Sequence, residues 1–534
     1  MENKRLLLGD EAIAIGAIHA GLSGVYAYPG TPSTEITEFI QTDPTALERK
    51  IRSRWCTNEK TAMEAALGMS YAGKRALVCM KHVGMNVCAD AFVNSAITGI
   101  NGGLVLLAAD DPSMHSSQNE QDSRFYGKFA MVPIMEPSNQ QECYDMMQEA
   151  FSLSETLKLP VMMRVVTRLA HSRAAVVMGT ASEQNSFNPD RNPQHWVLLP
   201  AIARRQYISL IEKQPQIADF SDKSRFNSYK KGNKLGIIAC GIAYNYVMEA
   251  ISGRNTEYAI LKVSQYPVPT EAVKDMAATC DSIIVVEDGQ PVVEQDVKAM
   301  VGAGFRIEGR LTGRLPRTGE LNPDNVASAL GFVNESEFSQ AGNISARPPQ
   351  LCNGCGHRDV YAALGQVLSA YPTARVFGDI GCYTLGALPP FKALDSTVDM
   401  GASITMAKGA ADAGVFPSIA VIGDSTFTHS GMTGLLDAVN DNANITVIIS
   451  DNLTTGMTGG QDSAGTNKFE AICLGLGVDP DHVKVVVPIP QNMPLITDTI
   501  RKEIEYQGVS VIIPRRECMQ TLNRRLRKAK AEKK

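Results

Sequence analysis

The stretch "GDSTFTHSGMTGLLDAVNDNANITVIISDN", residues 423–452, predicts a strand–helix–strand unit. The apolar, β-branched runs "SIAVIG" at its start and "ITVIIS" near its end are typical of buried parallel strands. Between them, "MTGLLDAVN" carries apolar residues at helical spacing. Asp424 follows the first strand, and Asp451 and Asn452 follow the second. Because ligands bind outside the carboxyl ends of parallel strands, we expect these polar residues to converge on one site.

The side-chain oxygens of Asp424 and Asn452 suit a magnesium ion that holds a phosphate. Mg²⁺ takes few protein oxygens and completes its octahedron with phosphates and water. The Gly-rich stretch "GMTGGQ", residues 456–461, would let backbone N–H groups approach a diphosphate closely. The alternative is that the polar residues are only N-cap or turn residues that end the strands.

The composition of the chain is that of a globular α/β protein of several domains. Its 534 residues are 44% hydrophobic and 20% charged, and the net charge is −5. This balance favours neither nucleic acid nor an anionic membrane as a partner. The start of the chain lacks a signal-peptide layout, and no apolar run is long enough to span a membrane. The eleven Cys therefore indicate reduced thiols and a cytoplasmic protein.

Strands and helices alternate in three parts of the chain, which predicts an α/β protein with three doubly wound parallel-sheet domains. Polar segments rich in Pro, Asn and Gly separate these parts, and the end of the chain is basic and helix-prone. The first of these polar segments is expected to contain one helix. The expected division is a first domain at 1–180, a linker at 181–231, a second domain at 232–312, a linker at 313–344, a third domain at 345–522 and a basic tail at 523–534.

The spacing of Asp424 and Asn452 resembles the fingerprint of thiamine diphosphate (ThDP) enzymes, which is Gly-Asp-Gly followed about thirty residues later by two Asn. Here Gly423 and Asp424 fit, Ser425 replaces the second Gly, and Asp451 replaces the first Asn. The replacements keep small size or an oxygen ligand. The resemblance implies that Mg²⁺ is bound by Asp424, Asn452 and the backbone carbonyl of Thr454.

ThDP enzymes also need a carboxylate that hydrogen-bonds the aminopyrimidine ring and favours the imino form that removes the C2 proton. The helix "NEKTAMEAALGMSYAG", residues 58–73, offers Glu59 and Glu64. Glu59 opens this helix directly after a strand, at the functional edge of the sheet, and is the expected catalytic residue. Glu64 lies more than a turn further into the helix. The alternative for Glu59 is a favourable interaction with the helix dipole only.

Further motifs extend the resemblance over residues 1–522. They are "YAYPGTPSTEITEFI" (26–40), "NEKTAMEAALGMSYAGKRALVCMKHVGMNV" (58–87), "DDPSMHSSQNEQDSR" (110–124), "RPPQLCNGCGHRDV" (347–360), "GDIGCYTLGALPP" (378–390) and "GDSTFTHSG" (423–431). Their order and residues are similar to those of the large subunits of indolepyruvate:ferredoxin oxidoreductases, a group within the ThDP-dependent 2-oxoacid:ferredoxin oxidoreductases. The three domains would then be pyrimidine-binding, transketolase-C-like and diphosphate-binding.

The resemblance implies oxidative decarboxylation of an aryl 2-oxoacid, such as indolepyruvate, to its acyl-CoA, a reaction of aromatic amino acid catabolism. It also implies a small partner subunit, coenzyme A as co-substrate and ferredoxin as electron acceptor. Thr31, in the turn "YPGTP", corresponds to the threonine that meets the substrate in the wider family.

One departure concerns the electron path. The family's large subunits usually end in a ferredoxin-like module with two Cys-rich runs that hold two [4Fe–4S] clusters. No such run occurs in these 534 residues. Electrons would leave elsewhere, such as through the partner subunit, or the protein has drifted from the redox reaction. The alternatives are a non-redox ThDP-dependent decarboxylase or lyase and a catalytically silent ThDP-binding subunit.

Four cysteines decide between redox and non-redox chemistry. Cys352 and Cys355 form a Cys-x₂-Cys turn, Cys382 follows an expected strand, and Cys518 follows the last apolar strand. Related 2-oxoacid oxidoreductases carry a cluster close to ThDP on a similar cysteine pattern. We therefore expect a [4Fe–4S] cluster on these four thiolates, serving as first electron acceptor. Zinc would accept the same ligands, and unrelated free thiols are the third alternative.

Overall fold

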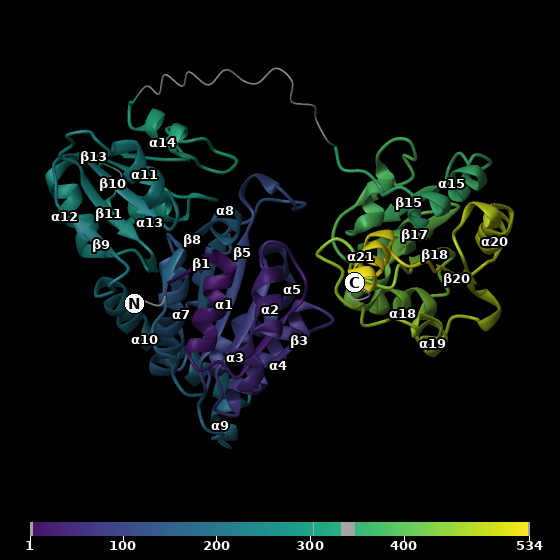
Figure 1. Ribbon diagram of the computed structural model, residues 1–534, viewed down its shortest axis with the longest axis horizontal. Coiled ribbons are helices and arrows are strands. Elements are labelled where there is room, and N and C mark those ends of the chain that lie inside the picture. The colour runs from purple at the N-terminus through teal and green to yellow at the C-terminus, as the bar shows by residue number, and fades with distance from the viewer. Residues whose placement is uncertain (1–3, 303, 333–347, 532–534) are drawn as a thin grey trace. The chain divides into compact units, whose positions relative to one another are not determined.

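The computed structural model describes residues 4–302, 304–332 and 348–531, and the chain forms two compact units (Figure 1). Unit 1 is Met1–Ser339 and unit 2 is Gln340–Lys534. Within the described ranges, the search for a helix with the length and apolar character of a membrane span finds none.

The first part of unit 1 is built on a seven-stranded sheet with the order β12-β6-β7-β5-β4-β2-β3. All neighbouring strands are parallel except β12, which pairs antiparallel with β6. The central strands β4 and β5 are buried almost throughout, as expected of strands covered by helices on both faces. The strands are β2 Gly24–Ala27, β3 Arg52–Trp55, β4 Ala76–Lys81, β5 Leu104–Asp110, β6 Ile134–Met135, β7 Val161–Val166 and β12 Gln265–Tyr266.

A second, two-stranded antiparallel sheet closes this part of unit 1. It consists of β1 (Lys4–Leu8) and β8 (Arg173–Val177), with Leu8 opposite Arg173. The sequence did not predict this pairing, which holds the start of α1 beside the end of α8. The helices around the larger sheet are α1 Gly9–His19, α2 Thr34–Thr42, α3 Pro44–Glu48, α4 Glu59–Tyr71, α5 His82–Thr98, α6 Arg124–Ala130, α7 Gln140–Leu157 and α8 Thr167–His171.

The segment 181–231 contains α9 (Pro193–Trp196), α10 (Pro200–Asp222) and the short strand β9 (Ser228–Lys230). β9 joins the five-stranded sheet that follows, whose order is β14-β13-β10-β11-β9, and only β9 in it is antiparallel. Its other elements are β10 Lys234–Cys240, α11 Ala243–Ile251, β11 Ala259–Val263, α12 Thr270–Thr279, β13 Cys280–Val286, α13 Val292–Val301, β14 Ile307–Glu308 and α14 Pro323–Ala329.

Buried arginines tie the two larger sheets of unit 1 together. Arg124 lies 2.5 Å from Asp122 and 2.9 Å from Glu287, and Arg164 lies 2.6 Å from Asp110. Arg164 also donates to the carbonyl of Asp288 at 2.9 Å. Since both guanidinium groups are fully buried, carboxylates from both sheets are needed to balance their charge.

Unit 2 contains an all-parallel sheet with the order β16-β15-β17-β18-β20-β19. The strands are β15 Arg375–Gly378, β16 Ser396–Thr397, β17 Ser418–Gly423, β18 Ile445–Ser450, β19 Val483–Val486 and β20 Val509–Pro514. The chain crosses from β15 to β16 on one side and returns to β17 on the other. The carboxyl ends of β15 and β17 therefore flank a topological switch point, where ligands bind in folds of this kind.

Helices cover both faces of the unit 2 sheet (Figure 1). Ala420 and Ile422 of β17 pack with α16, α18 and α19, whereas Ile419 and Val421 pack with α15 and α20. This alternation explains why "SIAVIG" is apolar at every position but its ends. The helices are α15 Gly356–Leu368, α16 Ala402–Asp412, α17 Asp424–Thr426, α18 Met432–Asn440, α19 Phe469–Gly475, α20 Met493–Glu505 and α21 Met519–Ala531.

Two segments expected from the sequence extend beyond the described residues. Of the linker at 313–344, residues 333–344 lie outside them. The basic tail at 523–534 forms the later part of α21, and its residues 532–534 also lie outside.

Candidate active site

Asp424 lies at the carboxyl end of β17, where the chain turns into α17. The residue is 3% exposed, and its Oδ1 accepts a hydrogen bond from the backbone N–H of Ser425 at 2.6 Å. Burial raises the pKa of Asp424 to about 7, and the charge of Asp451 adds to the shift. A bound cation would reverse this shift, since a nearby positive charge favours the ionised carboxylate.

Asn452 and Thr454 follow β18, the parallel neighbour of β17. The N–H of Thr454 lies 3.1 Å from Asp424 Oδ2 and 3.2 Å from Asn452 Oδ1, so the structure brings the side chains of two of the three predicted magnesium ligands to one point. Asp451 is oriented differently, because its carboxylate pairs with Arg515 at 2.6 Å. The residue that replaces the first Asn of the fingerprint therefore makes a buried ion pair within the protein.

Gly423 and Ser425 flank Asp424 and shape this turn. A Cβ at Gly423 would lie 2.5 Å from the ring of Tyr383, so a larger residue does not fit there. The Ser425 hydroxyl lies 2.8 Å from that of Thr455, which joins the ends of β17 and β18. Both predicted cofactor-binding residues thus lie at the same edge of the sheet as Asp424.

Asp379 is a further site residue that the sequence reasoning missed. It follows β15 at the switch point, is fully buried, and accepts hydrogen bonds from the hydroxyls of Tyr383 and Ser403. Burial raises its pKa to about 7. The sequence carried a signal for it, since "GDIG" at 378–381 repeats the strand–Gly–Asp pattern of "GDS".

The four candidate cluster ligands line one cavity of about 110 Å³ in unit 2. Cys352 and Cys355 precede α15, Cys382 follows β15, and Cys518 follows β20. Burial raises the pKa of Cys355, and it raises that of Cys382 to about 12, so both thiols are protonated when they bind no metal. The structure therefore gathers all four cysteines, although 166 residues separate Cys352 from Cys518.

The cysteine cavity borders the predicted magnesium ligands. Asn452 lines the cavity, and its carbonyl accepts a hydrogen bond from the N–H of Cys518 at 3.0 Å. A Cβ built on Gly456 would lie 3.4 Å from Cys382 Sγ and 3.8 Å from both Asn452 Nδ2 and Cys518 Sγ. The amide of Asn452 and these two thiols therefore border the same space beside Gly456.

The spacing of the four thiols bears on which metal group they could hold. A zinc ion with Zn–S bonds of about 2.3 Å holds four sulfurs roughly 3.8 Å apart. Among the residues that the structure describes, the one set of three or more His, Cys, Asp or Glu ligand atoms within 4.8 Å of one another lies in unit 1 and contains no cysteine. The four thiols are thus spread more widely than one tetrahedral ion requires.

Glu59 is the first residue of α4 and lies at the carboxyl edge of the sheet of unit 1, four residues after β3 ends. It is 5% exposed and packs against α5, where a Cβ at Gly84 would lie 2.7 Å from its Oε1. Glu64 is exposed and pairs with Lys60. Of the two candidate carboxylates, Glu59 is thus the one enclosed by the protein.

Thr31 lies in the turn between β2 and α2. β2, the strand that leads into this turn, pairs with β3. The turn is held by a bond from the Ser33 hydroxyl to the Gly30 carbonyl at 2.8 Å. Lys81, which ends β4, packs against this turn, since a Cβ at Gly30 would lie 3.0 Å from Lys81 Cβ. Burial lowers the pKa of Lys81 to about 8, and its Nζ donates a hydrogen bond to the carbonyl of Ser116 at 2.5 Å.

Comparison with known proteins places these features in a class. Residues 15–224 match the sequence model of the family described as "Pyruvate flavodoxin/ferredoxin oxidoreductase, thiamine diP-bdg". Residues 379–490 match that of "Thiamine pyrophosphate enzyme, C-terminal TPP binding domain". The solved 2-oxoglutarate:ferredoxin oxidoreductase from Magnetococcus marinus has a similar fold, with a TM-score of 0.51 and 16% identity over 62% of this chain and 65% of that one.

Two curated relatives are similar to this chain over nearly its whole length. The indolepyruvate oxidoreductase subunit IorA of Archaeoglobus fulgidus is 40% identical, over 96% of this chain and 86% of that subunit. The subunit of the same name from Methanothermobacter thermautotrophicus is 36% identical, over 97% and 87%.

These matches define an oxidoreductase of the ThDP-dependent class that oxidises 2-oxoacids, with domains that bind ThDP. Within that class, the chain belongs to the family of indolepyruvate oxidoreductase IorA subunits. The family resemblance and the α/β fold class predicted from the sequence are confirmed.

Proposed function

We propose that the chain catalyses the ThDP-dependent oxidative decarboxylation of an aryl 2-oxoacid, indolepyruvate or a close analogue, to the acyl-CoA. One 2-oxoacid and one coenzyme A thiol give one acyl-CoA, one CO₂ and one proton, and two electrons pass to two ferredoxin molecules. The names of the IorA relatives support the substrate class. The observation that carries the redox chemistry is the cavity in which four cysteines lie beside Asn452.

Asp424, Asn452 and the carbonyl of Thr454 are proposed to hold Mg²⁺, and through it the diphosphate. The fit rests on the buried Asp424 carboxylate, which shares the Thr454 N–H with the amide oxygen of Asn452 and whose pKa is raised by burial and by the charge of Asp451. Gly423 and Ser425 flank this carboxylate and are proposed to border the diphosphate. ThDP, when bound, would supply a nucleophilic carbon for the 2-oxoacid carbonyl and an electron sink for the loss of CO₂.

Glu59 and Thr31 are the proposed catalytic residues of unit 1. Glu59 would hold a proton shared with the aminopyrimidine ring, because its enclosure by α5 shields the carboxylate from water. Thr31 would orient the substrate by a hydrogen bond from its hydroxyl.

Cys352, Cys355, Cys382 and Cys518 are proposed to bind one [4Fe–4S] cluster. Thiolates are the ligands such a cluster takes, and four irons accept sulfurs that are spaced more widely than those around one zinc ion. A cluster in this cavity would lie next to Asn452 and so receive electrons one at a time from the cofactor. Cys352 is exposed, which gives the cluster an edge that a small partner subunit or ferredoxin can reach.

The test is an anaerobic assay with indolepyruvate and an artificial one-electron acceptor, with and without coenzyme A, on the chain together with its partner subunit. We expect acceptor reduction that depends on coenzyme A, one acyl-CoA for every two electrons, and about four irons and four sulfides per chain. Release of CO₂ with no acceptor reduction and no iron would instead identify a non-redox decarboxylase. Stoichiometric ThDP without turnover of any 2-oxoacid would identify a silent binding subunit.

A further inference from the structure

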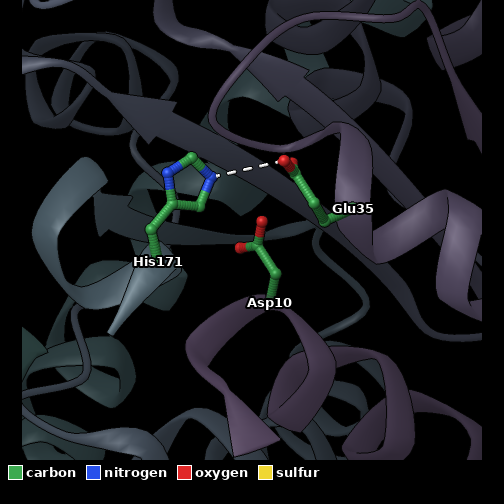
Figure 2. Close-up of side chains that lie close together, drawn as sticks. All are labelled: Asp10, Glu35 and His171. Atoms are coloured by element: carbon green, nitrogen blue, oxygen red, sulfur yellow. Dashed lines mark ion pairs between the residues drawn. The ribbon is translucent and has the colours of Figure 1, made fainter. Parts of the chain in front are cut away.

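Three ligand-bearing side chains meet in unit 1 below the Thr31 turn. They are Asp10 in the first turn of α1, Glu35 in the first turn of α2, and His171 at the end of α8. One ligand atom from each lies within 4.8 Å of the other two. In Figure 2 the Asp10 carboxylate points into the space between the Glu35 carboxylate and the His171 ring.

The carboxyl group of Asp10 is buried and unsatisfied. Its side chain is fully buried, and neither carboxylate oxygen has a hydrogen-bond partner within the described part of the chain. A buried carboxyl group without a partner is costly, so most such groups in native proteins are paired. Burial raises the pKa of Asp10 well above its ordinary value, and the charges of Glu35 and Glu11 raise it further. The charges that act most strongly on this carboxyl group are therefore those of other acids.

The backbone fixes the positions of Asp10 and His171 relative to each other. Leu8 pairs with Arg173 at the end of the β1–β8 sheet, so Asp10 and His171 each lie two residues beyond the same paired end. A Cβ at Gly9 would lie 2.2 Å from the carbonyl oxygen of Leu169, which shows how closely the two backbones approach. The arrangement is therefore set by packed elements and not by flexible side chains alone.

Glu35 and His171 complete the donor set and give access from solvent. His171 Nε2 lies 3.5 Å from Glu35 Oε1, and the two side chains are 35% and 38% exposed. An ion can thus reach the site from this side, while Asp10 closes the buried side. Two carboxylates and a neutral imidazole also balance the charge of one divalent cation, which suits a buried position.

We infer that Asp10, Glu35 and His171 form a binding site for one divalent first-row transition ion, of the Mn²⁺, Fe²⁺ or Zn²⁺ type. An imidazole nitrogen with two carboxylates favours such ions over Mg²⁺ and Ca²⁺, which prefer oxygen ligands alone. Bonds of about 2.1 Å hold neighbouring ligand atoms roughly 3–4 Å apart, so a small closure of the observed set suffices. The ion would tie α1, α2 and α8 together, and Glu35 lies four residues beyond Thr31.

The site is independent of the proposed function, and Mn²⁺ is the probe that tests it. Binding is followed by electron paramagnetic resonance on the purified chain in excess Mg²⁺, which fills all-oxygen sites. We expect the parent to bind one Mn²⁺ more than Asp10→Asn, and the bound ion to show nitrogen coupling from an imidazole. Glu38→Gln, which changes an exposed acid of the same helix as Glu35, should bind as the parent does.

Two further measurements guard against a folding artefact. His171→Gln, at a part-exposed position, should lose both the additional Mn²⁺ and the nitrogen coupling. Added Mn²⁺ should raise the melting temperature of the parent more than that of Asp10→Asn, because only a folded site binds the ion. Equal Mn²⁺ binding by parent and Asp10→Asn, or bound Mn²⁺ without nitrogen coupling, would overturn the site and leave Asp10 as a protonated or water-bridged carboxyl group.

Discussion

The carboxyl group of Asp424 is buried at the end of β17, and its pKa is raised to about 7. Removing it takes away a direct ligand of the proposed magnesium ion but little packing, since the residue ends a strand. Asp424→Ala should therefore keep the fold and lose affinity for ThDP by more than the roughly 10–100-fold that loss of an outer-shell partner costs.

Isothermal titration with ThDP and Mg²⁺ measures this loss, and circular dichroism checks the fold. Asp441→Ala, at an exposed acid of the same unit, is the matched control and should bind as the parent does. Unchanged ThDP affinity in Asp424→Ala would refute the assignment of this residue to the metal.

Glu59 should affect proton transfer and not cofactor binding. Glu59→Gln keeps the shape of the side chain but removes the carboxylate, so we expect normal ThDP affinity with exchange of the cofactor's C2 proton slowed by roughly 10²–10⁴-fold. Nuclear magnetic resonance in deuterated buffer measures that exchange. Glu64→Gln, at the exposed position of the same helix, should exchange at the parental rate. Slow exchange in Glu64→Gln instead would transfer the role to that residue.

Lys81 should titrate near pH 8, because burial lowers its pKa to about that value. An unfolded chain keeps the proton to a pH of about 10.5. Between these values the unfolded state binds more protons, so this lysine makes the free energy of unfolding rise as the pH rises from 8 to 10.5. Competitive acetylation across pH, read by mass spectrometry, should give a midpoint near 8 for Lys81. The exposed Lys60, whose pKa is raised by Glu64, should react only at higher pH, and a shared midpoint would contradict the prediction.

For single residues, the sequence predicted the positions of those that directly follow a strand. Asp424 and Asn452 could be predicted because polar residues after neighbouring parallel strands must meet. Asp379 was missed although its "GDIG" repeats the same pattern. Asp10 and His171 could not be predicted, because their meeting depends on the β1–β8 pairing, which leaves no periodic signal in so short a stretch.

The cysteine cavity lies at the carboxyl ends of three strands, β15, β18 and β20. Cys382 follows β15 and Cys518 follows β20, whereas Cys352 and Cys355 come from the turn before α15. The order of the strands explains the result, since β20 lies beside β18 and so places Cys518 against Asn452. The sequence predicted the strands but not their order, and so it left the choice between cluster, zinc and free thiols open.

Loss of one thiol should remove the cluster without removing ThDP. Cys382→Ala is expected to lower iron and sulfide from about four per chain to near zero, or to leave a three-iron cluster, with coenzyme A-dependent electron transfer abolished. Cys473→Ala, a buried thiol of α19 outside the cavity, should keep full iron content. Iron and sulfide analysis with electron paramagnetic resonance makes the measurement. Equal iron in the two variants would remove Cys382 from the ligand set.

The proposed reaction of the whole molecule requires a partner subunit in addition to this chain. The IorA relatives are named as subunits, and electron exit is proposed to use a partner. The purified chain alone should therefore show less than about a tenth of the coenzyme A-dependent activity of the complex, a tenfold difference corresponding to about 1.4 kcal/mol in the barrier. Adding the small subunit back should restore it. Full activity of the chain alone would refute the dependence.

Arg124 and Arg164 constrain where evolution can divide this chain. The match to the first family model ends at residue 224, yet the carboxylate of Glu287 and the carbonyl of Asp288, from the second large sheet, contact these arginines. Separating the two sheets would leave buried charges unpaired, at about 3–5 kcal/mol for a broken buried pair. The two sheets of unit 1 are therefore expected to be inherited as one module, because a gene fission or domain exchange between them would separate these buried pairs.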